Sequence, residues 1–496
     1  MLKGDISGIQ EYIFNVASKG AAKTLHEHSV NIMKIEEKYK NALKDKLGIS
    51  DAKIFKGGGG FHVTFEKSDG VDIEKLINNY QSQINSELEH SQLSVRLSYG
   101  CGDTFEMAWK DLVKKNNDKR YRLYGNINED LCNKLFKPFK KEDISSFENN
   151  IASISVAAVE NLHWTKELME SIEEIDLNKE QKKLYENINN KDKKNNMPLI
   201  DFDGYASFAE LRTGTDFLGV LKMDVDNLGK LFAKCKTIDE FEKKSEFFNT
   251  FFGKEKIEEL LNQTWLESWT YHQNIYSVYT GGDDCFFIGA WDAIFDFANV
   301  IHTEFEKQVK EEPNTDNITL SAGIVLLDAN TPVVQLGKMA EEALSEAKKR
   351  KVEIKTVKNA ICLMNEVFTW EDYKGIMEQT ETLTEFLTDK KITRGILEKI
   401  KKSSIGFDRL QQRIRKGETL PFDRVYKLKY YIRDVKKEYA DDLEKRIFHP
   451  YIDALTKILT NKSQAFSENY INPMRFPMAA RLAEFKTRNL KNNTNE

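Results

Sequence analysis

The chain has 496 residues, of which 40% are hydrophobic and 31% are charged, and its formal net charge is −5 at pH 7. This length predicts roughly three or four domains, and the charge excludes a global basic field that would attract nucleic acid. No run approaches the ~18 apolar residues of a membrane helix, and the five cysteines are too widely spaced to indicate a disulfide framework or a zinc site. We therefore expect a cytoplasmic protein without zinc and without a membrane partner.

The first predicted elements are those of a ferredoxin-like palm. A strand at Leu2–Ser7 is followed by a helical start at Ile9–Phe14 and by a strand–turn–strand around Gly57–Gly60. An amphipathic helix and a strand within Leu93–Cys101 follow. This order of strand, helix, two strands, helix and strand is typical of the βαββαβ fold, so we assign residues 1–115 to a first palm domain.

The next segment, 116–205, is charged and carries helical spacing, for example at Thr165–Ile175. A polar run at Asn187–Asn196 predicts an exposed loop. We expect a helical inter-palm domain here.

A second palm is predicted over residues 206–365. Its first strand, Phe217–Met223, ends on Asp224, and its central hairpin carries Gly281-Gly282-Asp283-Asp284 between two apolar strands. Glycines let the backbone approach phosphate and adopt turn angles that other residues resist. An ordinary hairpin with acidic turn residues is the alternative, but the additional acid at a strand end favours a magnesium site.

The last segment, 366–496, is charged and helical in its spacing, as at Arg424–Lys437 and Ala440–Ile458. No strand alternation is expected there, so the segment predicts a helical bundle. The overall fold class is therefore α+β, with two palm domains of the nucleotide cyclase or GGDEF type and two helical domains.

Three blocks of sequence recur in the same order, which predicts that the palm is duplicated. Leu2–Ser7 aligns with Leu221–Asp226, and Ile54–Phe61 aligns with Val278–Cys285. A third block aligns Leu93–Cys101 with Ile318–Val325. The first copy keeps Asp5 but has Gly59 and Gly60 where the hairpin acids would stand. One carboxylate cannot offset two divalent cations and a triphosphate, so we expect the first palm to be non-catalytic. It would either bind a nucleotide through its glycine turn (Gly58 and Gly59) and Ser7, or serve only in packing.

These motifs resemble the large polymerase-like subunit of type III CRISPR effector complexes, of the Csm-type branch. The resemblance rests on Gly4-Asp5-Ile6-Ser7-Gly8-Ile9-Gln10, on Leu221–Gly229 and on Gly281–Asp292, with weaker support from Ala479–Phe485. It implies synthesis of cyclic oligoadenylates from ATP, switched on by target RNA. It also implies a ribonucleoprotein setting with CRISPR RNA and other type III CRISPR subunits.

Two features depart from that family pattern. The family usually begins with an HD nuclease domain, whereas Gly4-Asp5 stands almost at the first residue here and no His-Asp dipeptide occurs. It also often carries a four-cysteine zinc module between the palms, where this chain has only Cys132. Neither HD nuclease activity nor zinc is therefore expected.

In the palm interpretation, Asp224, Asp283 and Asp284 are the catalytic and metal-binding residues, holding two Mg²⁺ (or Mn²⁺) ions against ATP. Metal electrostatics and alignment carry most of such a transfer. Gly281 and Gly282 would lie against phosphate, and Lys348 occupies the place of a phosphate-contacting lysine in GGDEF-like folds. A solvated helix lysine is an equal alternative for Lys348, because the residues after it form a basic run. For Asp226 a supporting role and an N-cap of the next helix are both open.

Three other functions remain to be distinguished. A stand-alone cyclase making a dinucleotide is disfavoured by the duplicated palm and the long helical tail. A scaffold without catalysis is disfavoured by the intact acids. The same active site joining AMP to another acceptor, such as S-adenosylmethionine, is compatible with every motif.

Overall fold

The computed structural model describes most of both sheets and the C-terminal helices. Its described residues are 1–14, 53–57, 60–65, 72–88, 93–122, 215, 217–266, 269–312, 318–328, 331, 333–352, 355–403, 437–460 and 472–488, with isolated residues between 28 and 41 and between 412 and 435. Most of the predicted inter-palm domain lies outside them, including the helical stretch at 165–175 and the polar run at 187–196. So does most of the helix expected at 424–437.

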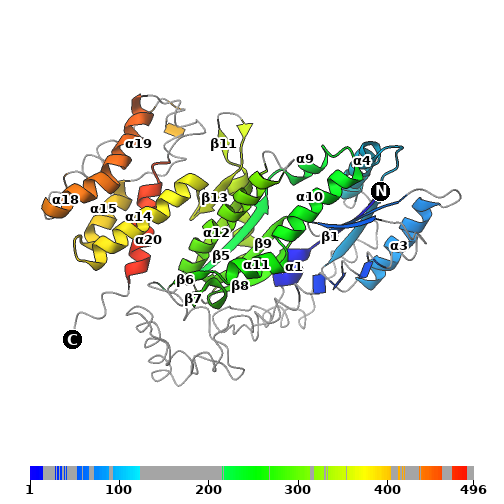
Figure 1. Cartoon of the computed structure of the whole chain (residues 1–496), viewed down its shortest axis with the longest axis horizontal. Coiled ribbons are helices and arrows are strands. Elements are labelled where there is room, and N and C mark those ends of the chain that lie inside the picture. Colours follow the sequence, from blue (N-terminus) through cyan, green and yellow to red (C-terminus); the bar gives the residue numbers. More distant parts are fainter. Residues whose placement is uncertain are drawn as a thin grey trace, which may run out of the picture.

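The N-terminal part forms a four-stranded antiparallel sheet (Figure 1). Its strand order, β2-β3-β1-β4, is that of a ferredoxin-like fold. Strand β1 lies between β3 and β4, and Asp5 is paired with Gly60 on one side and Arg96 on the other. The elements are β1 (Leu2–Ser7), α1 (Ile9–Phe14), β2 (Lys53–Gly57), β3 (Gly60–Thr64), α3 (Ile73–Glu87), β4 (Ser94–Tyr99) and α4 (Phe105–Arg122). Helix α4 runs across the predicted domain boundary at residue 115.

The second sheet repeats this order and extends it. Its strands follow the order β14-β13-β10-β5-β9-β8, in which β10-β5-β9-β8 matches β4-β1-β3-β2 of the first sheet. Asp224 of β5 is paired with Asp284 of β9, as Asp5 is paired with Gly60. The registers therefore agree with the predicted duplication. The central strands are β5 (Phe217–Val225), β8 (Ile275–Gly281), β9 (Asp284–Ala290) and β10 (Leu320–Asp328).

A hairpin beyond β10 contradicts the expectation that no strand follows residue 365. Strand β13 (Ala360–Leu363) lies parallel to β10, and β14 (Glu366–Thr369) returns antiparallel to β13. The connecting residues Met364 and Asn365 both have positive φ, 50° and 65°, as a two-residue hairpin turn requires. Strands of four residues are too short to show alternation in sequence, which is why the hairpin was missed.

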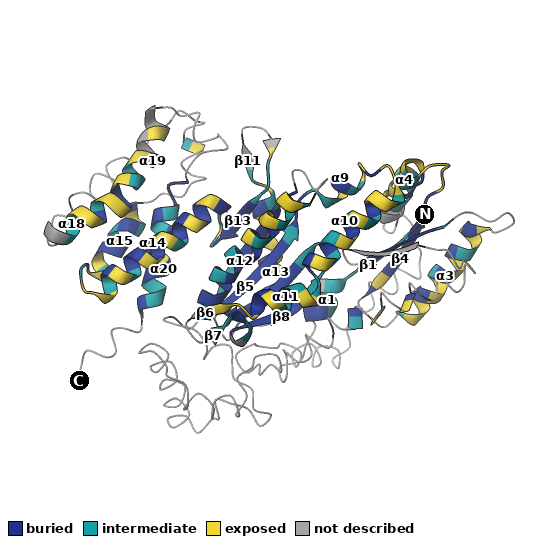
Figure 2. Cartoon of the chain, viewed as in Figure 1, coloured by how far each residue is buried: buried dark blue, intermediate teal, exposed yellow. Residues whose placement is uncertain are grey.

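Helices cover both faces of the second sheet. Helix α12 (Trp291–Glu311) packs so closely on β5 that a Cβ at Gly219 would lie 2.8 Å from Ile294. Helix α13 (Val333–Lys348) lies on the opposite face, where a Cβ at Gly323 would lie 2.4 Å from the backbone of Leu344. The strands between them are almost wholly buried (Figure 2). Because alternate residues of β5 face opposite helices, the even-numbered residues around Asp224 face α13.

The two palms pack directly on each other. Phe14 of α1 makes an edge-to-face contact with Phe286 of β9, with ring centroids 5.0 Å apart. The same ring closes over Gly337 of α13, where an added Cβ would lie 2.5 Å from it. An insertion of the second palm, α9 (Leu228–Phe232), α10 (Ile238–Phe251) and α11 (Lys254–Leu261), brings α10 against β2. The first palm thus lies against α13 and β9 of the second palm.

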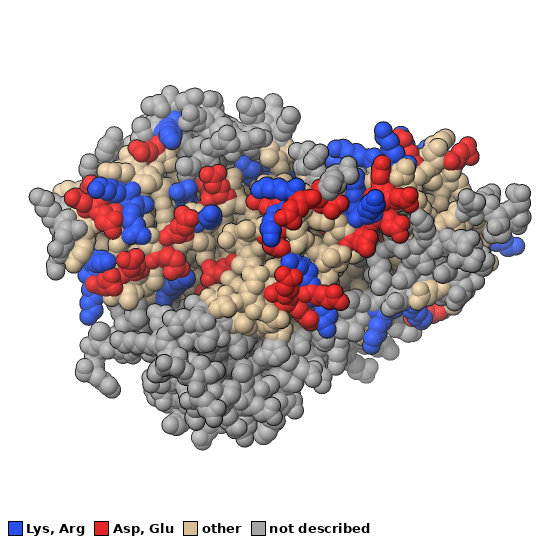
Figure 3. Space-filling model, in the orientation of Figure 1, with Lys and Arg blue, Asp and Glu red and all other residues tan. Residues whose placement is uncertain are grey.

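The C-terminal part is helical, as expected for residues 440–458. Helix α20 packs on α14 and α15, and Lys486 of α20 bonds to Glu381 of α14. Elements there are α14 (Trp370–Thr388), α15 (Arg394–Ser403), α18 (Lys437–Leu443), a π-helical turn (Glu444–Phe448), α19 (His449–Thr460) and α20 (Arg475–Thr487). Basic and acidic side chains are interspersed on the face shown in Figure 3. Within the described residues, no helix has the length and apolarity needed to cross a bilayer.

Candidate active site

The site is built where the end of β5 lies beside the start of β9. Asp224 and Asp284 are cross-strand partners, and Asp283 lies in the turn that precedes β9, its carbonyl accepting a 2.9 Å bond from the backbone N–H of Val225. Gly282 in that turn has a φ of 65°, a left-handed conformation that favours glycine. The structure therefore brings together the three predicted carboxylates on adjacent backbone positions.

Burial and mutual repulsion make these carboxylates hard to ionise without a cation. Burial, followed by the charge of Asp224, raises the pKa of Asp283 to about 6, while Lys348 and Lys3 act against this rise. Burial, followed by the charge of Asp283, raises the pKa of Asp284 to about 7. Burial also raises the pKa of Asp224, with Lys348 opposing it. Several acids with raised pKa values at one place are typical of functional sites.

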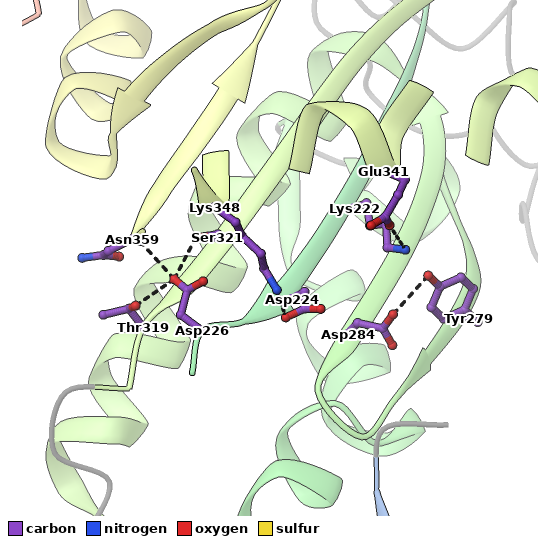
Figure 4. A network of polar contacts seen from close by, with 10 residues as sticks. All are labelled: Lys222, Asp224, Asp226, Tyr279, Asp284, Thr319, Ser321, Glu341, Lys348 and Asn359. Atoms are coloured by element: carbon purple, nitrogen blue, oxygen red, sulfur yellow. Dashed lines mark hydrogen bonds and ion pairs between the residues drawn. The ribbon is translucent and has the colours of Figure 1, made fainter. Parts of the chain in front are cut away.

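Two lysines, a tyrosine and a glutamate also take part in the polar network of Figure 4. Lys348, at the end of α13, donates to Asp224 Oδ1, so it lies beside the candidate metal-binding acids. Tyr279 donates to Asp284 Oδ2 at 3.2 Å. The buried Lys222 of β5 donates to Glu341 Oε2 of α13 at 2.5 Å. Lys222, Glu341 and Tyr279 were missed in the sequence, although a lysine inside the apolar strand Phe217–Val225 is a readable signal.

Asp226 does not have the N-cap role considered from sequence. It is fully buried, and its Oδ2 accepts bonds from Ser321 Oγ at 2.7 Å, Thr319 Oγ1 at 2.8 Å and the backbone N–H of Asn359 at 3.0 Å. The N-cap position of α9 is Asn227, with no side-chain capping bond. Asp226 therefore ties β5 to the start of β10 and to the residue before β13.

The equivalent position in the first palm is surrounded by basic rather than acidic side chains. Asp5 lies 3.3 Å from Lys3 Nζ and 3.9 Å from an Arg96 guanidinium nitrogen, so basic side chains neutralise it. A Cβ at Gly60 would lie 2.4 Å from the carbonyl oxygen of Gly4, which leaves no space for an acid there. Ser7 is half-buried on the same face of β1 as Asp5. The other two predicted nucleotide-binding residues, Gly58 and Gly59, lie outside the described residues.

The donor set suits a hard divalent cation that is shared with a ligand. Carboxylate oxygens are the side-chain ligands that Mg²⁺ takes, usually one or two of them together with water and substrate phosphates. In the described part of the chain, no three His, Cys, Asp or Glu side chains converge to hold a metal ion alone. Asp224, Asp283 and Asp284 therefore fit a magnesium ion that arrives with a phosphorylated substrate.

Comparisons with known proteins agree with these observations. The family model for the second palm domain of Cas10/Cmr2 matches residues 217–362, and the model for domain B of the Csm1 subunit matches residues 1–150. The chain is 26% identical over 490 residues to the CRISPR system single-strand-specific deoxyribonuclease Cas10/Csm1 (subtype III-A) of Methanocaldococcus jannaschii. That match covers 75% of this chain and 59% of that protein, so the chain spans less than two thirds of its relative.

Solved structures show the same fold. A Csm1–Csm4 cassette in complex with pppApApA aligns with a TM-score of 0.63 and 18% identity, covering 98% of this chain and 69% of that one. The Csm1–Csm4 cassette in complex with cA3 aligns with a TM-score of 0.60 and 18% identity, covering 97% and 69%.

Proposed function

This chain belongs to the Cas10/Csm1 family of type III-A CRISPR subunits, and we propose that it converts ATP to cyclic oligoadenylates when its effector complex recognises target RNA. The observation that carries the proposal is the cross-strand pair Asp224 and Asp284 with Asp283 in the adjoining turn. A relative's Csm1–Csm4 cassette has been solved with cA3 and with AMPPNP, which supports adenine nucleotides as its ligands. The partners would be CRISPR RNA, target RNA and other Csm subunits, in the cytoplasm.

In this proposal the three carboxylates hold Mg²⁺ (or Mn²⁺) against the triphosphate. When bound, the metal would make a ribose hydroxyl more acidic and neutralise charge on the leaving pyrophosphate. Tyr279 fixes the orientation of Asp284 by its hydrogen bond. Burial and the charge of Asp284 raise the pKa of Tyr279, so its hydroxyl stays protonated as a donor.

The other groups would position the nucleotide. Gly282, free of a side chain and with left-handed backbone, would let phosphate approach Gly281 and Gly282 closely. Lys348, which donates to Asp224 Oδ1, would contact a phosphate of the nucleotide there. We assign the acceptor nucleotide to the first palm, through Ser7 and the turn at Gly58 and Gly59, where Lys3 and Arg96 add positive charge around Asp5.

The test is a double variant, Asp283→Ala with Asp284→Ala, in the assembled complex. We expect product formation from ATP to fall by at least a thousandfold while assembly and target-RNA binding persist, because metal-ion catalysis contributes several kcal/mol. A matched control is Asp441→Ala with Asp442→Ala, which removes two adjacent exposed acids of α18. Near wild-type synthesis by the first variant would place the active site elsewhere.

A further inference from the structure

Two acid–lysine pairs of opposite polarity connect β5 to α13. On the strand, Lys222 and Asp224 are two residues apart and face the same side. On the helix, Glu341 pairs with Lys222, and Lys348, two turns further on, pairs with Asp224. Figure 4 shows both pairs on one face of the sheet. The strand lysine thus bonds to a helix acid, and the strand acid to a helix lysine.

The two lysines differ in access to solvent, although Glu341, the partner of Lys222, is 49% exposed. The Lys222 side chain is 4% exposed, so its ammonium is fixed between the sheet and α13. The side chains of Lys348 and Asp224 are 24% and 28% exposed, so this pair can be opened by an ion or ligand from solution. Lys348 can leave Asp224 by rotation of its side chain while Lys222 stays paired with Glu341.

Lys348 occupies the carboxylate that the proposed function assigns to the metal. Its ammonium contacts Asp224 Oδ1, and its charge opposes the pKa rise of Asp283 as well. Lys222 is itself neutralised by Glu341, so Lys348 is left to offset the aspartates, and a free divalent cation competes with it for Asp224. A cation alone would have to drive Lys348 from Asp224 without offering that lysine another anion.

We propose that Lys348 is an exchangeable substitute for the metal at Asp224, so that metal and nucleotide bind together. When a metal–triphosphate arrives, Lys348 moves from the carboxylate to a phosphate oxygen, and the metal takes its place on Asp224. Each cation then keeps an anionic partner, and no buried charge is left uncompensated. The inference rests on the proposed function and adds coupling between its two ligands.

The experiment measures binding rather than turnover. Mn²⁺ binding to the full chain is followed by electron paramagnetic resonance, with and without a non-hydrolysable ATP analogue. Wild type should bind Mn²⁺ weakly alone and much more tightly with the analogue. Lys348→Met should bind Mn²⁺ about tenfold more tightly alone, yet bind the analogue about tenfold more weakly, within the range typical of coupled sites. Lys348→Gln is a second variant with the same expectation.

Lys349→Met is the matched control, because Lys349 is the neighbouring exposed lysine and pairs only with Glu346 among the described residues. It should leave both affinities unchanged. Unchanged or weaker Mn²⁺ binding in both Lys348 variants without nucleotide would overturn the exchange. That result leaves the proposed function standing if Asp224→Asn abolishes Mn²⁺ binding in the presence of the analogue. Binding that survives Asp224→Asn would refute both.

Discussion

Replacing both hairpin acids by their amides should stabilise the metal-free protein while abolishing its activity. Asp283→Asn with Asp284→Asn keeps the shape of the turn and removes two carboxylates whose pKa values rise on folding to about 6 and about 7, from 3.8. A raised pKa means that folding opposes ionisation. The stability that the two protonated carboxyl groups contribute is fully present below their unfolded-state pKa of 3.8. It is lost as the pH rises through their folded-state values of about 6 and about 7.

The size of the effect follows from these pKa values. Each pKa unit corresponds to about 1.4 kcal/mol, so the two shifts taken singly amount to roughly 3 and 4 kcal/mol at pH 8. Their sum overcounts, because the charge of Asp283 is itself a cause of the Asp284 shift and solvent screens both half-buried groups. We expect the amide variant to gain roughly 2–3 kcal/mol in free energy of unfolding.

Urea unfolding in EDTA at several pH values measures this gain. The variant should be more stable than wild type at pH 8. The difference should close as the pH falls to 4, where the side chains at 283 and 284 are neutral in folded wild type and in the variant. Product formation from ATP, measured in the assembled complex with Mg²⁺, should be lost. A variant less stable than wild type at pH 8 would refute the reasoning that these carboxylates are held together against repulsion.

Five further substitutions, at four positions, probe the rest of the account. Asp226→Ala should lower the free energy of unfolding by about 3 kcal/mol, because two hydroxyls and a backbone N–H lose their buried acceptor; a neutral result in urea unfolding would contradict the bracing role. Gly282→Val should lower the free energy of unfolding by about 1–3 kcal/mol, because valine is strained at a φ of 65°. Gly282→Asn should lower it less, because asparagine tolerates this conformation better, and thermal unfolding measures both. Gly58→Val and Gly59→Val should each greatly reduce product with normal assembly and target-RNA binding; unchanged kinetics in both would make the first palm structural only.

Local chemistry explains which parts of the second palm could be predicted. The hairpin was predictable because Gly281-Gly282-Asp283-Asp284 stands between two apolar strands, and turn residues fix the register of such a pair. The pairing of Asp224 with Asp284 was not visible locally. The sequence showed only that one strand ends on an acid and that a hairpin carries two more. The structure shows the same register in both sheets.

The contacts that could not be predicted are those between α13 and β5. Glu341 meets Lys222 only because α13 crosses back over the strand on the face opposite α12. Sequence periodicity indicates that a helix is amphipathic, but not which strand residue lies beneath each turn. The hydrogen bonds of Asp226 could not be predicted for the same reason, because its three donors come from residues far along the chain.

The most direct test of the proposed function is identification of the product. The assembled complex would be incubated with labelled ATP and Mg²⁺, with and without target RNA and S-adenosylmethionine, and its products identified by mass spectrometry. We predict cyclic oligoadenylates that require target RNA and Asp283 with Asp284, and that are unaffected by S-adenosylmethionine. An adduct of AMP with S-adenosylmethionine, or no ATP-derived product from an intact complex bound to target RNA, would contradict the account.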